Sequence, residues 1–160
     1  MKKVLLVAMV GIISLSASAQ SLKGHIEGGY TFGDHDGGRL EFLGALGGKV
    51  NKHFFLGGGV GLNYYTTADI CTLPIFVNAR VKIPVSGNIR PFFDLKPGYG
   101  VSLDSDINGG FYFNGTFGIE FSKVTVGIGY GTQTFKVSDG FHTSAIGSNG
   151  GLSLKLGYEF

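Results

Sequence analysis

A histidine and a serine that could act together in hydrolysis stand two residues apart, at His142 and Ser144. A serine hydroxyl becomes a nucleophile when a histidine within hydrogen-bond reach takes its proton, and an acid usually orients that histidine. No acidic residue lies between Ser144 and Glu159, and we expect Glu159 at the opposite end of the fold. The pattern therefore favours a polar surface loop over a catalytic site.

Acidic residues cluster between the predicted strands and could in principle bind a hard cation. Six of the seven aspartates lie there: Asp34, Asp36, Asp69, Asp104, Asp106 and Asp139. Calcium prefers several oxygen ligands, but no complete ligand loop is present, and aspartate is also a common turn residue. Cys71 is the only cysteine, which excludes an intramolecular disulfide and a multi-thiolate metal site. We expect no metal and no cofactor.

The regular elements between which these residues lie are all expected to be β-strands. The chain has 29 Gly, 14 Phe and 7 Tyr among 160 residues, and after residue 20 no segment shows a clean helical period. Eight segments alternate in polarity and end at turn residues, and each is long enough to cross a bilayer as a tilted strand. They span 22–32, 39–50, 54–65, 72–83, 89–103, 111–121, 124–136 and 151–160.

The two faces of these strands differ sharply in charge. One face is apolar or aromatic and carries no charge in the body of any strand. The other face holds thirteen charged residues, and Lys49, Lys82 and Glu159 are three of them. The remaining ten form a predicted charge network inside a barrel: Lys23, Glu27, Arg39, Glu41, Arg80, Arg90, Asp94, Lys96, Glu120 and Lys155.

The N-terminus indicates secretion. Lys2 and Lys3 precede an apolar run, and Ala17-Ser18-Ala19 forms a small-residue cleavage site before Gln20. We therefore predict a signal peptide at residues 1–19 and a barrel domain at 20–160. Without Lys2 and Lys3 the chain has 11 basic and 11 acidic residues, so nothing in its net charge favours nucleic acid.

Three features choose a membrane barrel over a soluble one. A secreted chain can reach the outer membrane, aromatic residues lie near strand ends, and short connections alternate with longer ones. The longest connection is expected from Val137 to Gly150. We predict an all-β, eight-stranded antiparallel up-and-down transmembrane β-barrel in the bacterial outer membrane, with both termini periplasmic. Because Pro91 and Pro97 lack a strand donor, we expect a bulge at residues 96–98.

The interior is predicted to be plugged, with one alternative. Six inward aromatics would help to fill it: Phe55, Tyr65, Phe76, Phe92, Tyr112 and Phe135. Inward glycines on two opposite strands, at 57, 59 and 61 and at 127, 129 and 131, leave bare stripes. We expect Arg80, Arg90 and Lys96 to cover these stripes and to pair with Asp94 or Glu120. The alternative is a narrow cavity for a small ligand.

The last strand resembles an outer-membrane assembly signal. It has apolar or aromatic residues at alternate positions, Leu154, Leu156 and Tyr158, before the terminal Phe160. Residues 73–80, 90–99 and 110–119 look like strands of the small porin-like outer-membrane β-barrel family of Bacteroides-type bacteria, which are OmpA/OmpX-like barrels. That resemblance implies fold and location, but no catalytic residue.

A second resemblance concerns His142 and Ser144, which are similar to the His-x-Ser element of outer-membrane lipid A deacylases. The residue after Ser144 is alanine, and no suitable acid follows, which departs from that pattern. We therefore expect no enzymatic activity and a structural or surface-interaction role. The alternatives are a narrow small-molecule conduit and, third, a deacylase-like hydrolase. Expected partners are outer-membrane lipid and lipopolysaccharide, the outer-membrane assembly machinery and an extracellular partner bound through the loops.

Overall fold

A computed structural model describes residues 22–33, 37–67, 69–85, 87–103, 107–139 and 142–160 of the chain. Within the strands, it describes only the backbone of residues 107, 136–139 and 142–146. The described part contains strands and no helix. The strands are β1 (Leu22–Gly33), β2 (Arg39–Lys49), β3 (Phe54–Tyr65), β4 (Ile70–Lys82), β5 (Ile89–Ser102), β6 (Ile107–Asn108), β7 (Gly110–Phe121), β8 (Val124–Asp139) and β9 (His142–Glu159).

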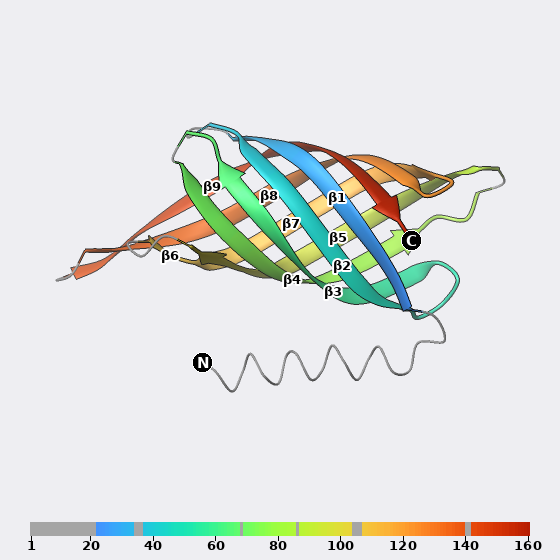
Figure 1. The fold of residues 1–160 in the computed structure, drawn as a ribbon, viewed down its shortest axis with the longest axis horizontal. Coiled ribbons are helices and arrows are strands. Elements are labelled where there is room, and N and C mark those ends of the chain that lie inside the picture. The colour runs from blue at the N-terminus through green and yellow to red at the C-terminus, as the bar shows by residue number, and fades with distance from the viewer. Residues whose placement is uncertain (1–21, 34–36, 68, 86, 104–106, 140–141) are drawn as a thin grey trace.

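The eight long strands close into an antiparallel barrel (Figure 1). Each pairs with its neighbour in sequence, apart from the two-residue β6, which pairs with the outer part of β8. Closure comes from β1 and β9, where Ile26 lies opposite Tyr158. Beyond the strand, Gly24 and Phe160 exchange two backbone hydrogen bonds of 3.2 and 2.9 Å. The first and last strands therefore begin and finish at the same end of the barrel, called the terminal end below.

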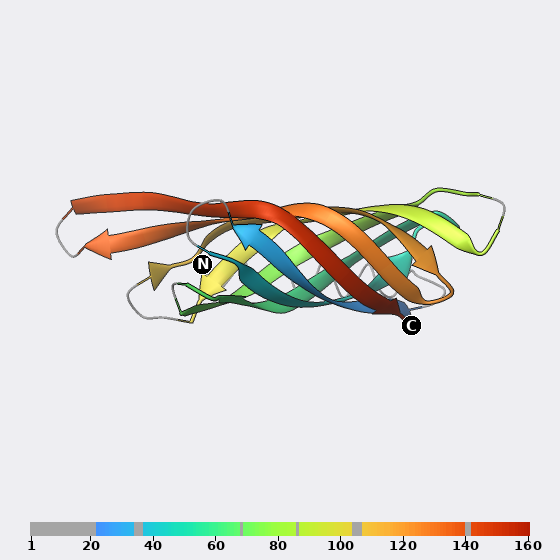
Figure 2. The same ribbon diagram turned by 90° about the horizontal axis from the view of Figure 1, so that it is seen from above.

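The predicted fold class is confirmed, and most predicted strand limits agree with the structure to within two residues. The exception is the expected long loop from Val137 to Gly150, which is wrong. Here β8 and β9 continue to pair as far as Asp139 and His142, with one register irregularity after Val137. This hairpin projects beyond the other strands at the end opposite Leu22 and Phe160 (Figure 2). Because ladder hydrogen bonds do not require lipid contact, glycine and polar residues that indicated a loop can still pair as strands.

The expected bulge at residues 96–98 is also wrong. The β5 register is the same on both sides of Pro97, since Phe76 pairs with Gly98 and Ala79 with Leu95. The ladder between β4 and β5 simply lacks its two pairs in between. Pro74 accompanies the same kind of gap between β3 and β4. The barrel thus accommodates a missing donor by omitting ladder bonds, without inserting a residue.

Polar and apolar residues are distributed in the reverse of a soluble protein. Buried positions are occupied mainly by charged and polar side chains, including Arg39, Glu41, Asp94 and Lys96. Large apolar side chains are exposed all around the outside, and none of the residues assigned to the outer face is buried. The predicted face of each strand is therefore confirmed. In the described residues, no helix is long and apolar enough to span a membrane.

Candidate functional site: the charged barrel interior

Glu27, on β1, is the acidic centre of the barrel interior. Its carboxylate lies 2.8 Å from Nζ of Lys96, 3.2 Å from Nζ of Lys155 and 3.5 Å from Nη2 of Arg80. These cations come from β5, β9 and β4, and all of them are buried. One carboxylate therefore holds together side chains from three distant parts of the sequence.

Asp94 forms a second acidic centre beside the first. Its Oδ2 accepts from Nη2 of Arg80 at 2.5 Å and from Nζ of Lys96 at 2.8 Å, while Asn78 donates to Oδ1. The guanidinium of Arg80 also lies over the Phe92 ring, 4.6 Å from its centroid. Arg80 is thus fixed by charge on one side and by an aromatic face on the other.

Near the terminal end, Lys82 is the bridging cation. Its Nζ donates to both carboxylate oxygens of Glu159, at 2.7 and 2.6 Å, and lies 2.5 Å from Oε2 of Glu120. Arg90 is 3.6 Å from Glu120, but its side chain is 55% exposed. Arg90 therefore belongs to the rim of the barrel.

Toward the opposite end, the network becomes less charged. Arg39 pairs with Glu41 and donates to the Tyr65 hydroxyl at 3.0 Å. Glu41 also lies 2.8 Å from Nζ of Lys155. Beyond this layer, the side-chain oxygen of Gln133 accepts from Tyr65 at 3.0 Å and from Thr72 at 3.2 Å.

These contacts join strands that lie on opposite sides of the lumen. Four pairs of strands lie directly opposite each other in the ring order. Each is bridged by at least one side-chain contact: β1 to β5 by Glu27 and Lys96, β2 to β7 by Glu41 and Asn114, β3 to β8 by Tyr65 and Gln133, and β4 to β9 by Lys82 and Glu159. Polar side chains therefore bridge the interior between all four opposite strand pairs, while some buried polar atoms, such as Nε2 of His25, have no hydrogen-bond partner among the described residues.

The bare glycine stripes are also covered, but not by the residues expected. A Cβ atom at Gly59 would lie 2.5 Å from the Phe76 ring, and one at Gly131 would lie 2.6 Å from Nη2 of Arg39. Leu43 lies similarly against Gly61. The prediction that Arg80, Arg90 and Lys96 would lie across the stripes is not supported there. Phe76 and Leu43 are the register partners of Gly59 and Gly61 on the adjacent strands, whereas Arg39 reaches Gly131 on β8 from β2, which is not adjacent to it.

Most of the predicted network residues meet inside the barrel. Eight of the ten are buried and joined by ion pairs: Glu27, Arg39, Glu41, Arg80, Asp94, Lys96, Glu120 and Lys155. Lys23 is half buried and joins none of the ion pairs between described residues, and Arg90 is at the rim. Lys82 and Glu159, placed on this face but outside the predicted network, belong to it.

The neutral members were missed, although the alternation of the strands contained their signal. Asn63, Asn78, Asn114 and Gln133 share the parity of the inward charges and are fully buried. His25 does too, and stacks edge-on against Phe55 at 5.7 Å. His25, Glu27 and Asp94 bring possible ligand atoms within 4.8 Å of one another. Because the two carboxylates already hold Arg80, Lys96 and Lys155, a metal ion would have to displace these cations.

Other candidate residues lie where the structure gives no side-chain geometry. Asp34, Asp36, Asp104 and Asp106 are outside the described residues. Only the backbone is described for Asp139, His142 and Ser144, which lie in the projecting hairpin. Asp69 is exposed and accepts a 2.7 Å hydrogen bond from the Tyr64 hydroxyl.

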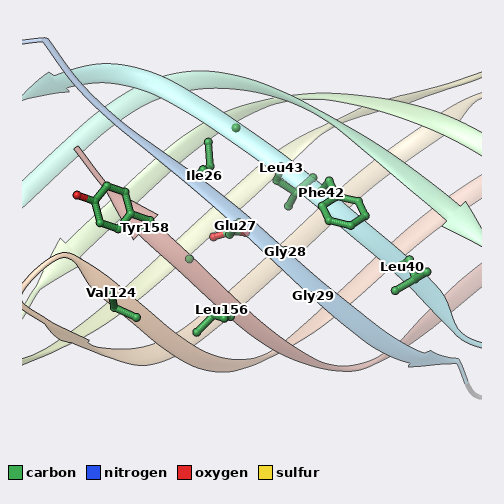
Figure 3. A pocket seen from close by; sticks show the side chains of 12 residues that line it. Ile26, Glu27, Gly28, Gly29, Leu40, Phe42, Leu43, Val124, Leu156 and Tyr158 are labelled. Atoms are coloured by element: carbon green, nitrogen blue, oxygen red, sulfur yellow. The ribbon is translucent and has the colours of Figure 1, made fainter.

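One concavity lies on the outside of the barrel, over β1, β2, β8 and β9 (Figure 3). It has a volume of about 830 Å³, and its walls include Ile26, Phe42, Leu156 and Tyr158. Gly28 and Gly44 contribute no side chain and leave the wall recessed. This hollow faces the surroundings of the barrel and not its lumen.

Comparisons with known proteins identify the fold. No family model and no curated protein matches the chain. Among solved structures, it is similar to the outer membrane enzyme PagL, with a TM-score of 0.66 and 13% identity over 84% of this chain and 98% of that chain. It is also similar to the N-terminal β-barrel domain of Pseudomonas aeruginosa OprF, with a TM-score of 0.54 and 13% identity over 89% and 98% of the two chains. Neisserial surface protein A gives a TM-score of 0.53 and 11% identity over 87% and 97%. These similarities show that the chain has the fold of OmpA/OmpX-like outer-membrane barrels.

Proposed function

We propose that this protein is a closed outer-membrane barrel with a structural or surface-interaction role and no catalytic activity. The observation that carries the proposal is the set of side-chain bridges between all four opposite strand pairs. Five buried or mostly buried cations face five carboxylates: Arg39, Arg80, Lys82, Lys96 and Lys155 against Glu27, Glu41, Asp94, Glu120 and Glu159. Charge balance and cross-links of this kind among the described residues support a lumen closed to solutes.

The apolar outer wall supports membrane placement. An exposed surface of this size made of leucine, isoleucine, valine and phenylalanine would be unfavourable in water, but it matches a hydrocarbon layer. A closed barrel also satisfies its strand backbone without a free edge, which a bilayer requires. We propose the outer membrane as the location, with the terminal end in the periplasm, and membership of the porin-like barrels of Bacteroides-type bacteria.

Fractionation tests this location directly. The predicted signal peptide, residues 1–19, lies outside the described residues. The mature protein should begin at Gln20 and fractionate with the outer membrane, and recovery of a chain that begins at Met1 in the cytosol would contradict this.

Deletion of Phe160 should lower the assembled amount, because the assembly machinery would lose the end of its recognition strand. Unchanged levels would contradict the proposed assembly signal.

The projecting β8–β9 hairpin supports a surface-interaction role. It continues to pair well past the other strands at the end opposite Leu22 and Phe160 (Figures 1 and 2). In the proposed orientation it extends outward from the cell, on the side of the membrane that carries lipopolysaccharide. A paired hairpin presents a fixed surface to an extracellular partner at a lower entropic cost than a flexible loop.

The closed lumen is tested by conductance. Purified protein in planar bilayers should show no stable large openings. Shortening Arg80 to alanine should introduce conductance only if the side chain blocks a path, and Lys123→Ala at an exposed turn is the matched control. Stable conductance of the wild-type protein that changes with Arg80→Ala, but not with Lys123→Ala, would instead establish the conduit alternative.

A further inference from the structure

A basic pocket lies at the terminal end, between the β2–β3 turn and the β4–β5 connection. It has a volume of about 230 Å³, and five of its lining residues are basic side chains: Lys49, Lys52, His53, Lys82 and Arg90. The remaining wall is apolar and is formed by residues 83–85. The pocket adjoins the charged interior and shares Lys82 with it.

The backbone around this pocket is held in a defined shape. The Asn51 side-chain oxygen accepts from the backbone N–H groups of His53 and Phe54, at 2.8 Å each. The His53 carbonyl accepts from the Lys82 N–H at 2.7 Å, which ties the turn to the end of β4. The basic side chains therefore extend from a fixed frame.

The protein neutralises only part of the positive charge of the pocket. Lys82 forms salt bridges with Glu159 and Glu120, and Arg90 forms a longer one with Glu120. Within the described part of the chain, Lys49 and Lys52 are exposed and form no salt bridge, although Lys49 interacts electrostatically with Glu159 at longer range. This contrasts with the interior, where every buried cation is paired. Two free cations beside a concavity indicate a site for an anion.

The surroundings of the pocket indicate which kind of anion. Val50, Ile83, Val85 and Ile89 are exposed next to it, on the outer side of the barrel. The outward aromatic residues Phe121, Tyr158 and Phe160 lie at the same end, and aromatic girdles mark the level of lipid headgroups. Basic side chains that could bind a phosphate therefore lie next to apolar side chains that could contact acyl chains, at the level of the barrel where lipid headgroups are expected.

We infer that this pocket binds the phosphate headgroup of an anionic phospholipid, with the acyl chains along the adjacent apolar wall. The inference rests on the proposed membrane function. Lys49 and Lys52 contact the phosphate, and the exposed Arg90 side chain adds positive charge beside it. In the proposed orientation the ligand is a lipid of the periplasmic leaflet.

The test compares lipid selectivity in refolded protein. Spin-labelled phosphatidylglycerol and phosphatidylcholine are each added to phosphatidylcholine vesicles that contain the protein, and the motionally restricted fraction of each label is measured. Wild-type protein should prefer phosphatidylglycerol. Each lysine near an anionic lipid is worth about a fivefold change in affinity, so the double variant Lys49→Gln, Lys52→Gln should lose most of the preference.

The double variant Lys23→Gln, Lys123→Gln is the matched control, because it removes the same charge from the same end of the barrel, outside the pocket. It should retain the preference, as should wild-type protein in excess inorganic phosphate at constant ionic strength. Equal losses in both variants would indicate general surface charge and overturn the inference. Loss in inorganic phosphate would replace the lipid with a free anion, which also overturns it.

Circular dichroism separates these outcomes from failure of the proposed function. A wild-type protein that does not insert and form β-structure in vesicles contradicts the membrane barrel itself. A protein that inserts and shows no preference for phosphatidylglycerol contradicts only the lipid site. Both lysines are exposed and unpaired among the described residues, so their replacement should leave the β-structure intact.

Discussion

The inner and outer walls of the barrel are built from alternate residues of the same strands, yet they follow different rules. On β9, Ser153 and Lys155 are buried in the polar interior, while Leu154 and Leu156 are exposed on the apolar outside. Lys155 has specific partners on β1 and β2. Leu154 needs only an apolar environment. An inward residue is therefore constrained by individual partners, whereas an outward residue is constrained by its depth in the lipid.

The largest effect is expected from removing the central acid. Glu27→Ala leaves Lys96, Lys155 and Arg80 with excess buried charge, which should lower the free energy of unfolding by about 3 to 5 kcal/mol. Denaturant titration of protein in lipid vesicles measures this loss. The double variant Glu27→Ala, Lys96→Met should recover part of it, because one unpaired cation is removed as well. A single-variant cost below about 1 kcal/mol would show that the inner wall does not depend on its partners.

A charge on the outer wall should cost somewhat less, and its cost should depend on depth. Leu154→Arg places a charge toward the bilayer centre and should cost about 2 to 4 kcal/mol, whereas Leu22→Arg near the rim should cost about 0 to 1 kcal/mol. The same titration compares the two variants. Equal costs would mean that the outer wall does not span a hydrocarbon layer.

Ser153→Arg places the same charge on the inner wall, next to Leu154 in the sequence. Ser153 is only 2% exposed, and its hydroxyl would lie 3.0 Å from a Cβ atom at Gly129. The inner wall is polar, but polarity alone would not make arginine tolerable there. Among the described residues the interior offers it neither space nor an unpaired carboxylate, so we expect Ser153→Arg to cost at least as much as Leu154→Arg.

The smallest effect on stability is expected from the interrupted backbone ladder between β4 and β5. Pro97→Ala restores an N–H group at a position where the ladder between β4 and β5 is interrupted. A single hydrogen bond contributes about 0.5 to 1.5 kcal/mol net, so the variant should be more stable by up to about that amount. The Pro97 side chain is exposed, and its replacement creates no cavity inside. A lower stability would show that the gap has another cause.

Most of the fold was predictable from the sequence because strand alternation is a local property. Charges at Glu27, Arg80 and Lys155 define the inner face, and the apolar residues beside them, such as Val81 and Leu154, define the outer face. The predictions failed where local composition was ambiguous. Glycine, serine and asparagine before Leu152 indicated a loop but pair as strand, and Pro97 indicated a bulge where the ladder only skips two pairs.

The sequence by itself determined that this chain forms eight apolar-out, charge-in strands, because each side chain alternates across a strand whatever its neighbours are. Only the tertiary structure decided which charges meet. Glu27 reaches Lys96 across the lumen, and Arg39, not Arg80, covers Gly131. Such partners depend on the stagger of all eight strands around the closed ring, which no single strand encodes. The contrast between a neutralised interior and the free lysines of the rim pocket arises in the same way.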